Sequence, residues 1–153
     1  MVQTIGQLFA HSSKPLAVHA RDPVLYAVRT MNEGMVGSVL VLDESERLVG
    51  IFTERDVLTR VIEGRCDARK TPVRDVMTAT PVTIDADCTL DDAFALMDDH
   101  EVCHLPVIDR GEVIGVVALR DLSEVATELL GYENRVLHRY IHGPLARAEE
   151  NYV

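Results

Sequence analysis

Two aspartates stand at matching places in this chain of 153 residues. Asp56 ends the segment GIFTERD at residues 50–56, and Asp121 ends the segment GVVALRD at residues 115–121. In both segments an apolar run suited to a buried strand gives way to helical periodicity, so each aspartate is expected at the start of a helix. A carboxylate there can accept hydrogen bonds from two adjacent hydroxyls, and the first-turn amides can hold a phosphate. Thr53 would add a hydroxyl, and Arg55 and Arg120 would add positive charge.

The same residues have an interpretation that needs no ligand. Thr53 followed three residues later by Asp56 is also a helix N-cap with an acidic N3 residue, which stabilises a helix by itself. In the second segment Ala118 stands at the place of Thr53 and cannot cap a helix, yet Asp121 keeps its position. The repeated spacing favours the binding interpretation. The hydroxyl missing at Ala118 predicts two unequal sites.

The two segments belong to a longer internal repeat. Residues 14–43 align with residues 80–109 at an offset of 66, which becomes 65 after one residue is lost in a turn. Helical and strand periods alternate in both copies, which indicates an α/β (α+β) unit of order β-α-β-β-α used twice. The expected strands are 16–18, 38–42 and 48–52, then 82–84, 105–108 and 113–117. Asp22 is the expected N-cap of the first helix, with Pro23 at its first position, and Thr89 with Asp92 three residues on is the expected capping box of the second. Each copy closes with a helix, over 54–62 and 119–130.

The organisation along the chain follows from the repeat. We expect a first domain over residues 1–66 with a short N-terminal helix over residues 2–10, and a second domain over residues 67–130. A helical tail covers residues 131–153, with an apolar stripe that must be buried against its own domain or a partner. The short lead-in at residues 73–77 is the counterpart of the N-terminal helix.

The repeated segments, the run LPV at residues 105–107 and the lead-in VRDVMT at residues 73–78 together resemble a tandem pair of CBS (cystathionine-β-synthase) domains, also called a Bateman module. The resemblance covers residues 1–130, and the tail is similar to that of small stand-alone bacterial CBS-pair proteins. It implies two repeats packed as a pseudo-two-fold pair. It also implies an adenine-containing ligand such as AMP, ADP, ATP, NAD or S-adenosylmethionine in the cleft between them.

The resemblance gives the candidate residues their roles. Asp56 and Asp121 would accept hydrogen bonds from the two ribose hydroxyls, and the first strand of each copy would line a slot for adenine. His104 stands where the family often places a phosphate contact, and Ser38 is its counterpart. The candidate nucleotide-binding residues are Lys14, Pro15, Ser38, Thr53, Arg55, Asp56, Thr80, Pro81, Val82, His104, Arg120 and Asp121. Ligand binding would shift the population of repeat arrangements and so signal to a regulated target, from a module that is itself expected to be a homodimer.

Composition limits the other classes of function. A net charge of −10 argues against nucleic acid as a general partner, and the chain has no apolar run long enough to span a membrane. No signal peptide is visible and the three cysteines are widely spaced, so a cytoplasmic protein is expected. His100 with His104, and His138 with His142, have a four-residue spacing that could hold a metal, but the change of period near Glu101 and a solvated helix face argue against both.

Two further hypotheses stay open. Cys103 beside His104 could act in a small cysteine-dependent enzyme, although no orienting third group or oxyanion site is indicated. Alternatively, the chain could be a ligand-free homodimerisation module with the tail as its interface. The leading hypothesis has no catalytic residue, no metal and no obligatory cofactor.

Overall fold

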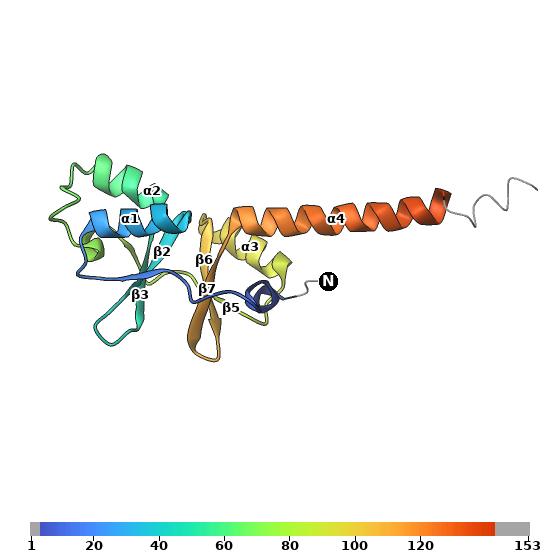
Figure 1. The fold of residues 1–153 in the computed structure, drawn as a ribbon, viewed down its shortest axis with the longest axis horizontal. Helices are drawn as coiled ribbons and strands as arrows, with labels where there is room; N and C mark the ends of the chain where they lie inside the picture. Colours follow the sequence, from blue (N-terminus) through green and yellow to red (C-terminus); the bar gives the residue numbers. More distant parts are fainter. Residues whose placement is uncertain (1–3, 143–153) are drawn as a thin grey trace, which may run out of the picture. The chain divides into compact units, whose positions relative to one another are not determined.

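The two repeats fold as two small sheets, each with its own helices (Figure 1). The computed structural model describes residues 4–142, and the side chains of residues 4–138. Within these residues 4–118 form one unit and the last helix forms another, so the two are described separately.

The first repeat builds a four-stranded sheet of order β1-β2-β3-β4. Its elements are β1 (Ala17–His19), α1 (Val24–Gly34), β2 (Ser38–Leu42), β3 (Leu48–Thr53), α2 (Glu54–Asp56) and a π-helical continuation η2 (Val57–Ile62). β1 runs parallel to β2, and β2 runs antiparallel to β3. The short β4 (Thr78–Ala79), which the sequence did not predict, comes from beyond the linker and pairs with β3.

The second repeat builds a three-stranded sheet of order β5-β6-β7. Its elements are β5 (Ile84–Asp85), α3 (Leu90–His100), β6 (His104–Asp109) and β7 (Glu112–Ala118), followed by α4 (Leu119–His142). Again the first strand is parallel to the second and the second is antiparallel to the third. The predicted mixed fold and the β-α-β-β-α order of each copy are confirmed.

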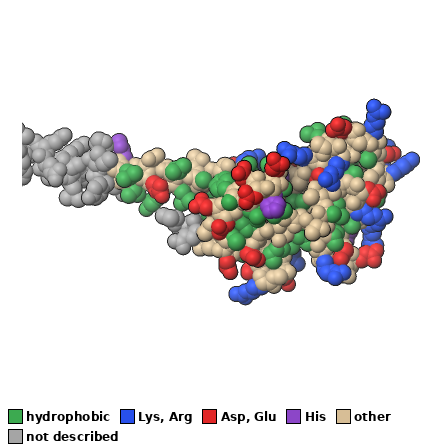
Figure 2. Space-filling model, turned by 180° about the vertical axis from the view of Figure 1, so that it is seen from behind, with side chains coloured by type: hydrophobic (Ala, Val, Ile, Leu, Met, Phe, Trp, Pro, Cys, Tyr) green, Lys and Arg blue, Asp and Glu red, His purple; other side chains and the backbone are tan. Residues whose placement is uncertain are grey.

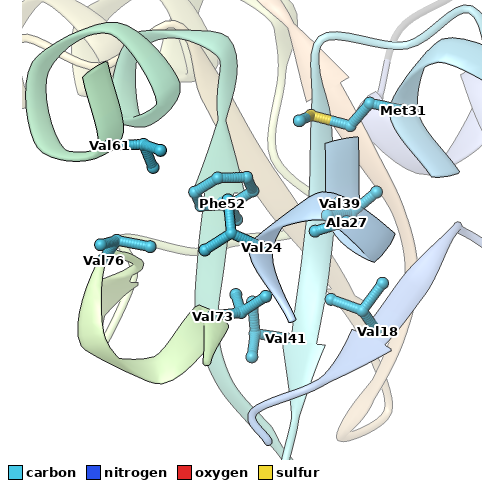
Figure 3. Packing of buried hydrophobic residues seen from close by; sticks show 10 residues of the cluster. All are labelled: Val18, Val24, Ala27, Met31, Val39, Val41, Phe52, Val61, Val73 and Val76. Carbon is cyan, nitrogen blue, oxygen red and sulfur yellow. The ribbon is translucent and has the colours of Figure 1, made fainter. Parts of the chain in front are cut away.

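The core of the first repeat lies between its sheet and the helices that cover one face of it (Figure 3). Branched side chains dominate because both β2 and β3 are buried there, as near-continuous apolar strands must be. Phe52 is fully buried near the end of β3. The cluster comprises Val18, Val24, Ala27, Met31, Val39, Val41, Phe52, Val61, Val73 and Val76.

Each lead-in segment packs on the repeat that it does not precede. The 3₁₀ helix η1 (Ile5–Phe9) donates its Ile5 and Gly6 amides to carbonyls of the second repeat, Cys88 and Ala86, both at 2.8 Å. The 3₁₀ helix η3 (Val73–Asp75) donates its Val73 amide to Asp22 in the first repeat, also at 2.8 Å. The sequence grouped the N-terminal helix with the first domain, whereas in space it contacts the second.

The first glycine of each repeated segment, Gly50 or Gly115, allows a side chain from a lead-in segment to pack directly against the strand. A Cβ on Gly50 would overlap Met77, and a Cβ on Gly115 would overlap the ring of Phe9. Met77 precedes the second repeat and Phe9 precedes the first. Both glycines are therefore required by close approach of a side chain from the other lead-in.

The predicted short N-terminal helix is present as the 3₁₀ segment η1. Two local predictions differ from the structure. Asp22 was expected to cap α1, but its carboxylate accepts from the amide of His19 at 2.8 Å, and Pro23 is the N-cap residue. The closing helix and the start of the tail form one continuous helix, because an isolated glycine such as Gly131 costs a long helix only about 1 kcal/mol.

Candidate functional site

The turn from β3 into α2 places the first candidate aspartate. β3 ends at Thr53 and the helix begins at Glu54, so Asp56 occupies the third helical position. The Thr53 hydroxyl accepts from the Asp56 amide at 3.3 Å, and the Asp56 carboxylate accepts from the Thr53 amide at 3.0 Å. This reciprocal capping box is what the ligand-free interpretation of the sequence predicted.

The Asp56 carboxylate has two further partners. The Thr78 hydroxyl donates to its Oδ1 at 3.3 Å, and Arg60 Nε lies 3.6 Å from the same oxygen. Arg60 also donates to the backbone carbonyl of Met77. We call Thr53, Asp56, Arg60 and Thr78 the Asp56 cluster. It fixes the start of α2 to β4, the segment that leads into the second repeat.

The carboxylate at the centre of this cluster is buried. Asp56 is 5% exposed and, with Ser38, is one of two buried polar residues among those described. A buried carboxylate must be paired, and here both oxygens are engaged within the chain. A ribose could use this carboxylate only by replacing Thr78 or Arg60.

A second group of side chains crosses between the repeats. A Cβ placed on Gly37 would lie 3.2 Å from His104 Nε2 and 3.4 Å from Glu54 Oε2, so both side chains flank the same point. The Glu54 amide donates to the Gly37 carbonyl at 3.0 Å. The structure therefore brings His104 of the second repeat to the helix start of the first. The carboxylate of Glu54 stands where it would compete with a phosphate for His104.

Strand register confirms the pairing of positions between the repeats. Ser38 lies opposite Thr53 across β2 and β3, and His104 lies opposite Ala118 across β6 and β7. Ser38 is buried and His104 is half-buried. The two candidate phosphate positions are thus structurally equivalent but chemically different.

The second candidate aspartate has a different environment. β7 ends at Ala118, and Asp121 lies in the first turn of α4 with its side chain exposed. Arg120 lies beside it, also exposed, with its Nε 3.9 Å from Glu124 Oε1. Because residue 118 is an alanine, the second repeat cannot form the reciprocal capping box that Thr53 and Asp56 form in the first repeat.

The remaining candidates lie on the strand approaches. Lys14 is exposed and Pro15 is half-buried, just before β1, whereas Pro81 and Val82 are half-buried before β5. Thr80 has a φ of 48°, a left-handed conformation that a β-branched residue rarely adopts. Its amide donates to Val49 in β3 at 3.3 Å, which ties this strained residue to the first repeat. Arg55 is exposed.

Sequence reasoning missed three residues of this region. Arg60, which was not among the candidate residues, pairs with Asp56, and its i,i+4 spacing was a signal that the sequence offered. Glu54 and His104 come to the same point beside Gly37, and Thr78 contacts Asp56, only through tertiary folding, because the members of these pairs are 50 and 22 residues apart along the chain. No local pattern carries such contacts.

The other constellations separate in the structure. His100 ends α3 and His104 begins β6, with Glu101 in a left-handed conformation between them. Among the described residues, no group of three or more His, Cys, Asp or Glu side chains could hold a metal. Cys103 is an exposed free thiol. The side chain of His142 lies outside the described residues.

Comparison with known proteins identifies the family. The CBS domain model matches residues 5–63 and 73–128. The chain therefore belongs to the CBS-domain family and carries two copies of the domain. No described helix is long and apolar enough to cross a membrane.

Individual relatives agree with this assignment. The meiotically up-regulated gene 70 protein of Schizosaccharomyces pombe is 36% identical over 115 residues, which is 69% of this chain and 16% of that protein. The chain spans between 16% and 52% of the lengths of three curated relatives, from Schizosaccharomyces pombe, Arabidopsis thaliana and Methanopyrus kandleri.

Solved structures share the fold. The CBS domain protein NE2398 superimposes with a TM-score of 0.75 at 32% identity, covering 82% of this chain and 98% of that one. The CBS domain protein PAE2072 of Pyrobaculum aerophilum, solved in complex with AMP, has a TM-score of 0.70 at 22% identity, covering 82% and 99%.

Proposed function

We propose that this chain is a regulatory module that binds an adenine nucleotide of the AMP, ADP, ATP or NAD type and signals through a change in its conformation. CBS pairs are commonly regulatory and can bind AMP, as the Pyrobaculum aerophilum protein does. A regulated target protein would read the ligand-bound arrangement of the repeats.

One observation carries the proposal. In both repeats a buried strand ends, a helix begins, and an aspartate stands in its first turn. In the second repeat Ala118 offers no hydroxyl for a reciprocal cap, yet an aspartate stands at the same place in Asp121. A carboxylate kept at both positions suits the two hydroxyls of a ribose.

The free-energy cost of binding a ribose differs between the two aspartates. Asp56 must give up Thr78 or Arg60 before it can accept from a ligand, and breaking such a contact costs roughly 1–3 kcal/mol. Asp121 is exposed, so a ligand can reach its carboxylate without the uncovering that the buried Asp56 requires. We therefore assign the tighter nucleotide site to Asp121 and a weaker one to Asp56.

The proposed role is not catalytic. His104 is the first residue of β6, and Cys103 precedes the strand as an exposed free thiol. His104 Nε2 lies beside Gly37, where the carboxylate of Glu54 also lies. A turnover abolished by Cys103→Ala and unaffected by Asp121→Asn would support the enzyme hypothesis instead.

A thermal-shift panel with AMP, ADP, ATP and NAD tests the proposal. A nucleotide at 100 times its dissociation constant stabilises the folded state by about 2.7 kcal/mol, which raises the melting temperature measurably. We expect at least one nucleotide to do so, and Asp121→Asn to remove most of the rise. Inosine monophosphate, in which a carbonyl replaces the amino group of the base, serves as the control for adenine recognition.

Two results would count against the proposal. If no nucleotide raises the melting temperature, the module does not bind this ligand class. If the rise survives both Asp56→Asn and Asp121→Asn, the nucleotide binds elsewhere and the aspartates serve only the helix starts.

A further inference from the structure

A carboxylate stands beside the histidine that is the candidate phosphate contact of the proposed function. A Cβ on Gly37 would lie 3.2 Å from His104 Nε2 and 3.4 Å from Glu54 Oε2, so side chains from different repeats flank one point. The Glu54 amide donates to the Gly37 carbonyl at 3.0 Å, which fixes the backbone that carries this carboxylate. An anion that binds at His104 Nε2 therefore also lies close to a negative charge.

Stabilisation of the helix start does not by itself explain this placement. A carboxylate in the first turn interacts favourably with the helix dipole, but that interaction does not require it to lie beside a histidine. The first turn of α2 already has Asp56 in its reciprocal cap. In the second repeat the position of Glu54 is occupied by Leu119, so that copy folds without a carboxylate there. The negative charge at this position is thus a feature of the first repeat alone.

The effect of Glu54 on a ligand depends on the charge of the ligand's phosphate. Like charges a few ångströms apart repel each other, and physiological salt screens fully only over distances longer than about 8 Å. The phosphate of AMP is a monoester with a second pKa near 6, so it carries about two negative charges above pH 7. Each phosphate of an adenine dinucleotide of the NAD type is a diester and carries a single charge. Glu54 therefore repels the monoester more strongly than the diester.

The charge of the whole chain adds to this local effect. Residues 1–79 carry ten basic and ten acidic side chains, whereas residues 80–153 carry five basic and fifteen acidic ones. Lys and Arg side chains gather over the first repeat in Figure 2. The second repeat, which supplies His104, therefore brings no excess of positive charge to offset Glu54. A ligand with fewer negative charges meets less repulsion from such a protein.

We propose that Glu54 is a specificity-determining residue of the nucleotide site, and that it selects phosphodiester ligands of the adenine-dinucleotide type over phosphate monoesters such as AMP. This inference rests on the proposed function, because it names the ligand class for the same site. Glu54 acts on the charge of the phosphate and not on the adenine or the ribose, so its removal should change the preference between ligands without abolishing binding.

Equilibrium dialysis of the full chain with two ligands that differ by one charge tests the inference. AMP and its 5′-O-methyl phosphate ester share the base and the ribose, but the ester keeps a single negative charge on its phosphate. We expect the wild type to bind the ester more tightly than AMP. Glu54→Gln keeps the size of the side chain and removes its charge. It should tighten AMP more than the ester, so that the ratio of the AMP to the ester dissociation constant falls on the order of ten-fold.

The design separates charge from other effects. Any contact of the added methyl group is the same in both proteins and cancels when their ratios are compared. Glu63→Gln, at an exposed glutamate that follows η2 in the same repeat, is the matched control and should leave the ratio unchanged. Glu54 is exposed as well, so both variants should fold, which circular dichroism checks.

The possible failures point to different claims. An unchanged ratio in folded Glu54→Gln, an equal fall in Glu63→Gln, or a wild type that prefers AMP would overturn this inference and leave nucleotide binding standing. If neither ligand binds to any of the three proteins, the proposed function is overturned and this inference with it.

Discussion

At the scale of single residues, the two aspartates have different surroundings although they occupy equivalent positions in the two repeats. Asp56 is buried and holds Thr53, Thr78 and Arg60, whereas Asp121 is exposed on the first turn of α4. One alanine at position 118 accounts for part of this difference, since it cannot form the reciprocal cap. A buried carboxylate that is engaged within the protein contributes mainly to stability, whereas an exposed carboxylate can be reached from solvent.

This contrast predicts unequal costs for the same substitution. Asp56→Asn replaces one carboxylate oxygen by an amide donor that faces other donors, so we expect a loss of about 1–3 kcal/mol in the free energy of unfolding. Asp121→Asn should cost less than about 0.5 kcal/mol, as is usual at exposed positions. Urea unfolding followed by circular dichroism measures both. Equal losses would contradict the assignment of Asp56 to structure.

Thr78 offers a finer test of the Asp56 cluster. Thr78→Val keeps the shape of the side chain and removes its hydroxyl, so it deletes the bond to Asp56 Oδ1 and frees that oxygen. We expect a stability loss of about 1 kcal/mol. We also expect tighter nucleotide binding at the Asp56 site, because the ligand no longer displaces the hydroxyl. Thr83→Val, at an exposed threonine outside the candidate residues, is the matched control. An unchanged affinity in Thr78→Val would show that Thr78 does not compete with the ligand.

At the scale of elements, periodicity predicted most helices and strands, and local chemistry predicted one cap well. The reciprocal box of Thr89 and Asp92 at the start of α3 is present, with the Thr89 amide donating to the Asp92 carboxylate at 2.9 Å. The cap at Asp22 was wrong because that carboxylate turns back to His19. β4 and the exchange of lead-in segments could not be predicted, since strand pairing and packing across repeats leave no periodic signal.

The cap on α3 makes the free energy of unfolding depend on pH in the acidic range. Hydrogen bonds from the Thr89 backbone amide and hydroxyl lower the pKa of Asp92 below its ordinary value of 3.8. A lowered pKa in the folded state means that the stabilisation is present above pH 3.8 and is lost as the pH falls through the folded pKa. Carbon-detected NMR titration should place the Asp92 midpoint below 3.8, and Thr89→Val should move it upward. An unshifted midpoint in both proteins would contradict the cap.

Each lead-in segment packs on the repeat that it does not precede, so a substitution in a lead-in should destabilise the other repeat. Phe9→Ala removes the ring that covers Gly115, so amide hydrogen exchange should accelerate in β6 and β7 of the second repeat, although Phe9 precedes the first. Met77→Ala should instead accelerate exchange in β3, where Met77 covers Gly50. If Phe9→Ala affected β2 and β3 and spared β6 and β7, η1 would not pack on the second repeat in solution.

At the scale of the whole molecule, the two copies of the repeat share a fold but differ in net charge, in the exposure of their aspartates and in their exposed apolar side chains. The first repeat has an engaged aspartate, balanced charge and an exposed apolar helix surface. The second carries the net negative charge and an exposed aspartate. The repeat and its motif could be found from the sequence because they recur at a fixed offset. Burial of Asp56 and the approach of His104 to Glu54 depend on how the repeats pack, which no single copy encodes.

The central claim is that a nucleotide binds this module through an aspartate at a helix start. Equilibrium dialysis of radiolabelled AMP against wild-type protein, Asp121→Asn and Asp56→Asn tests that claim most directly, because it counts bound ligand without relying on a stability change. We predict saturable binding in the wild type, loss of the tighter binding in Asp121→Asn, and its retention in Asp56→Asn. No saturable binding to the wild type, or identical binding to all three proteins, would contradict the claim.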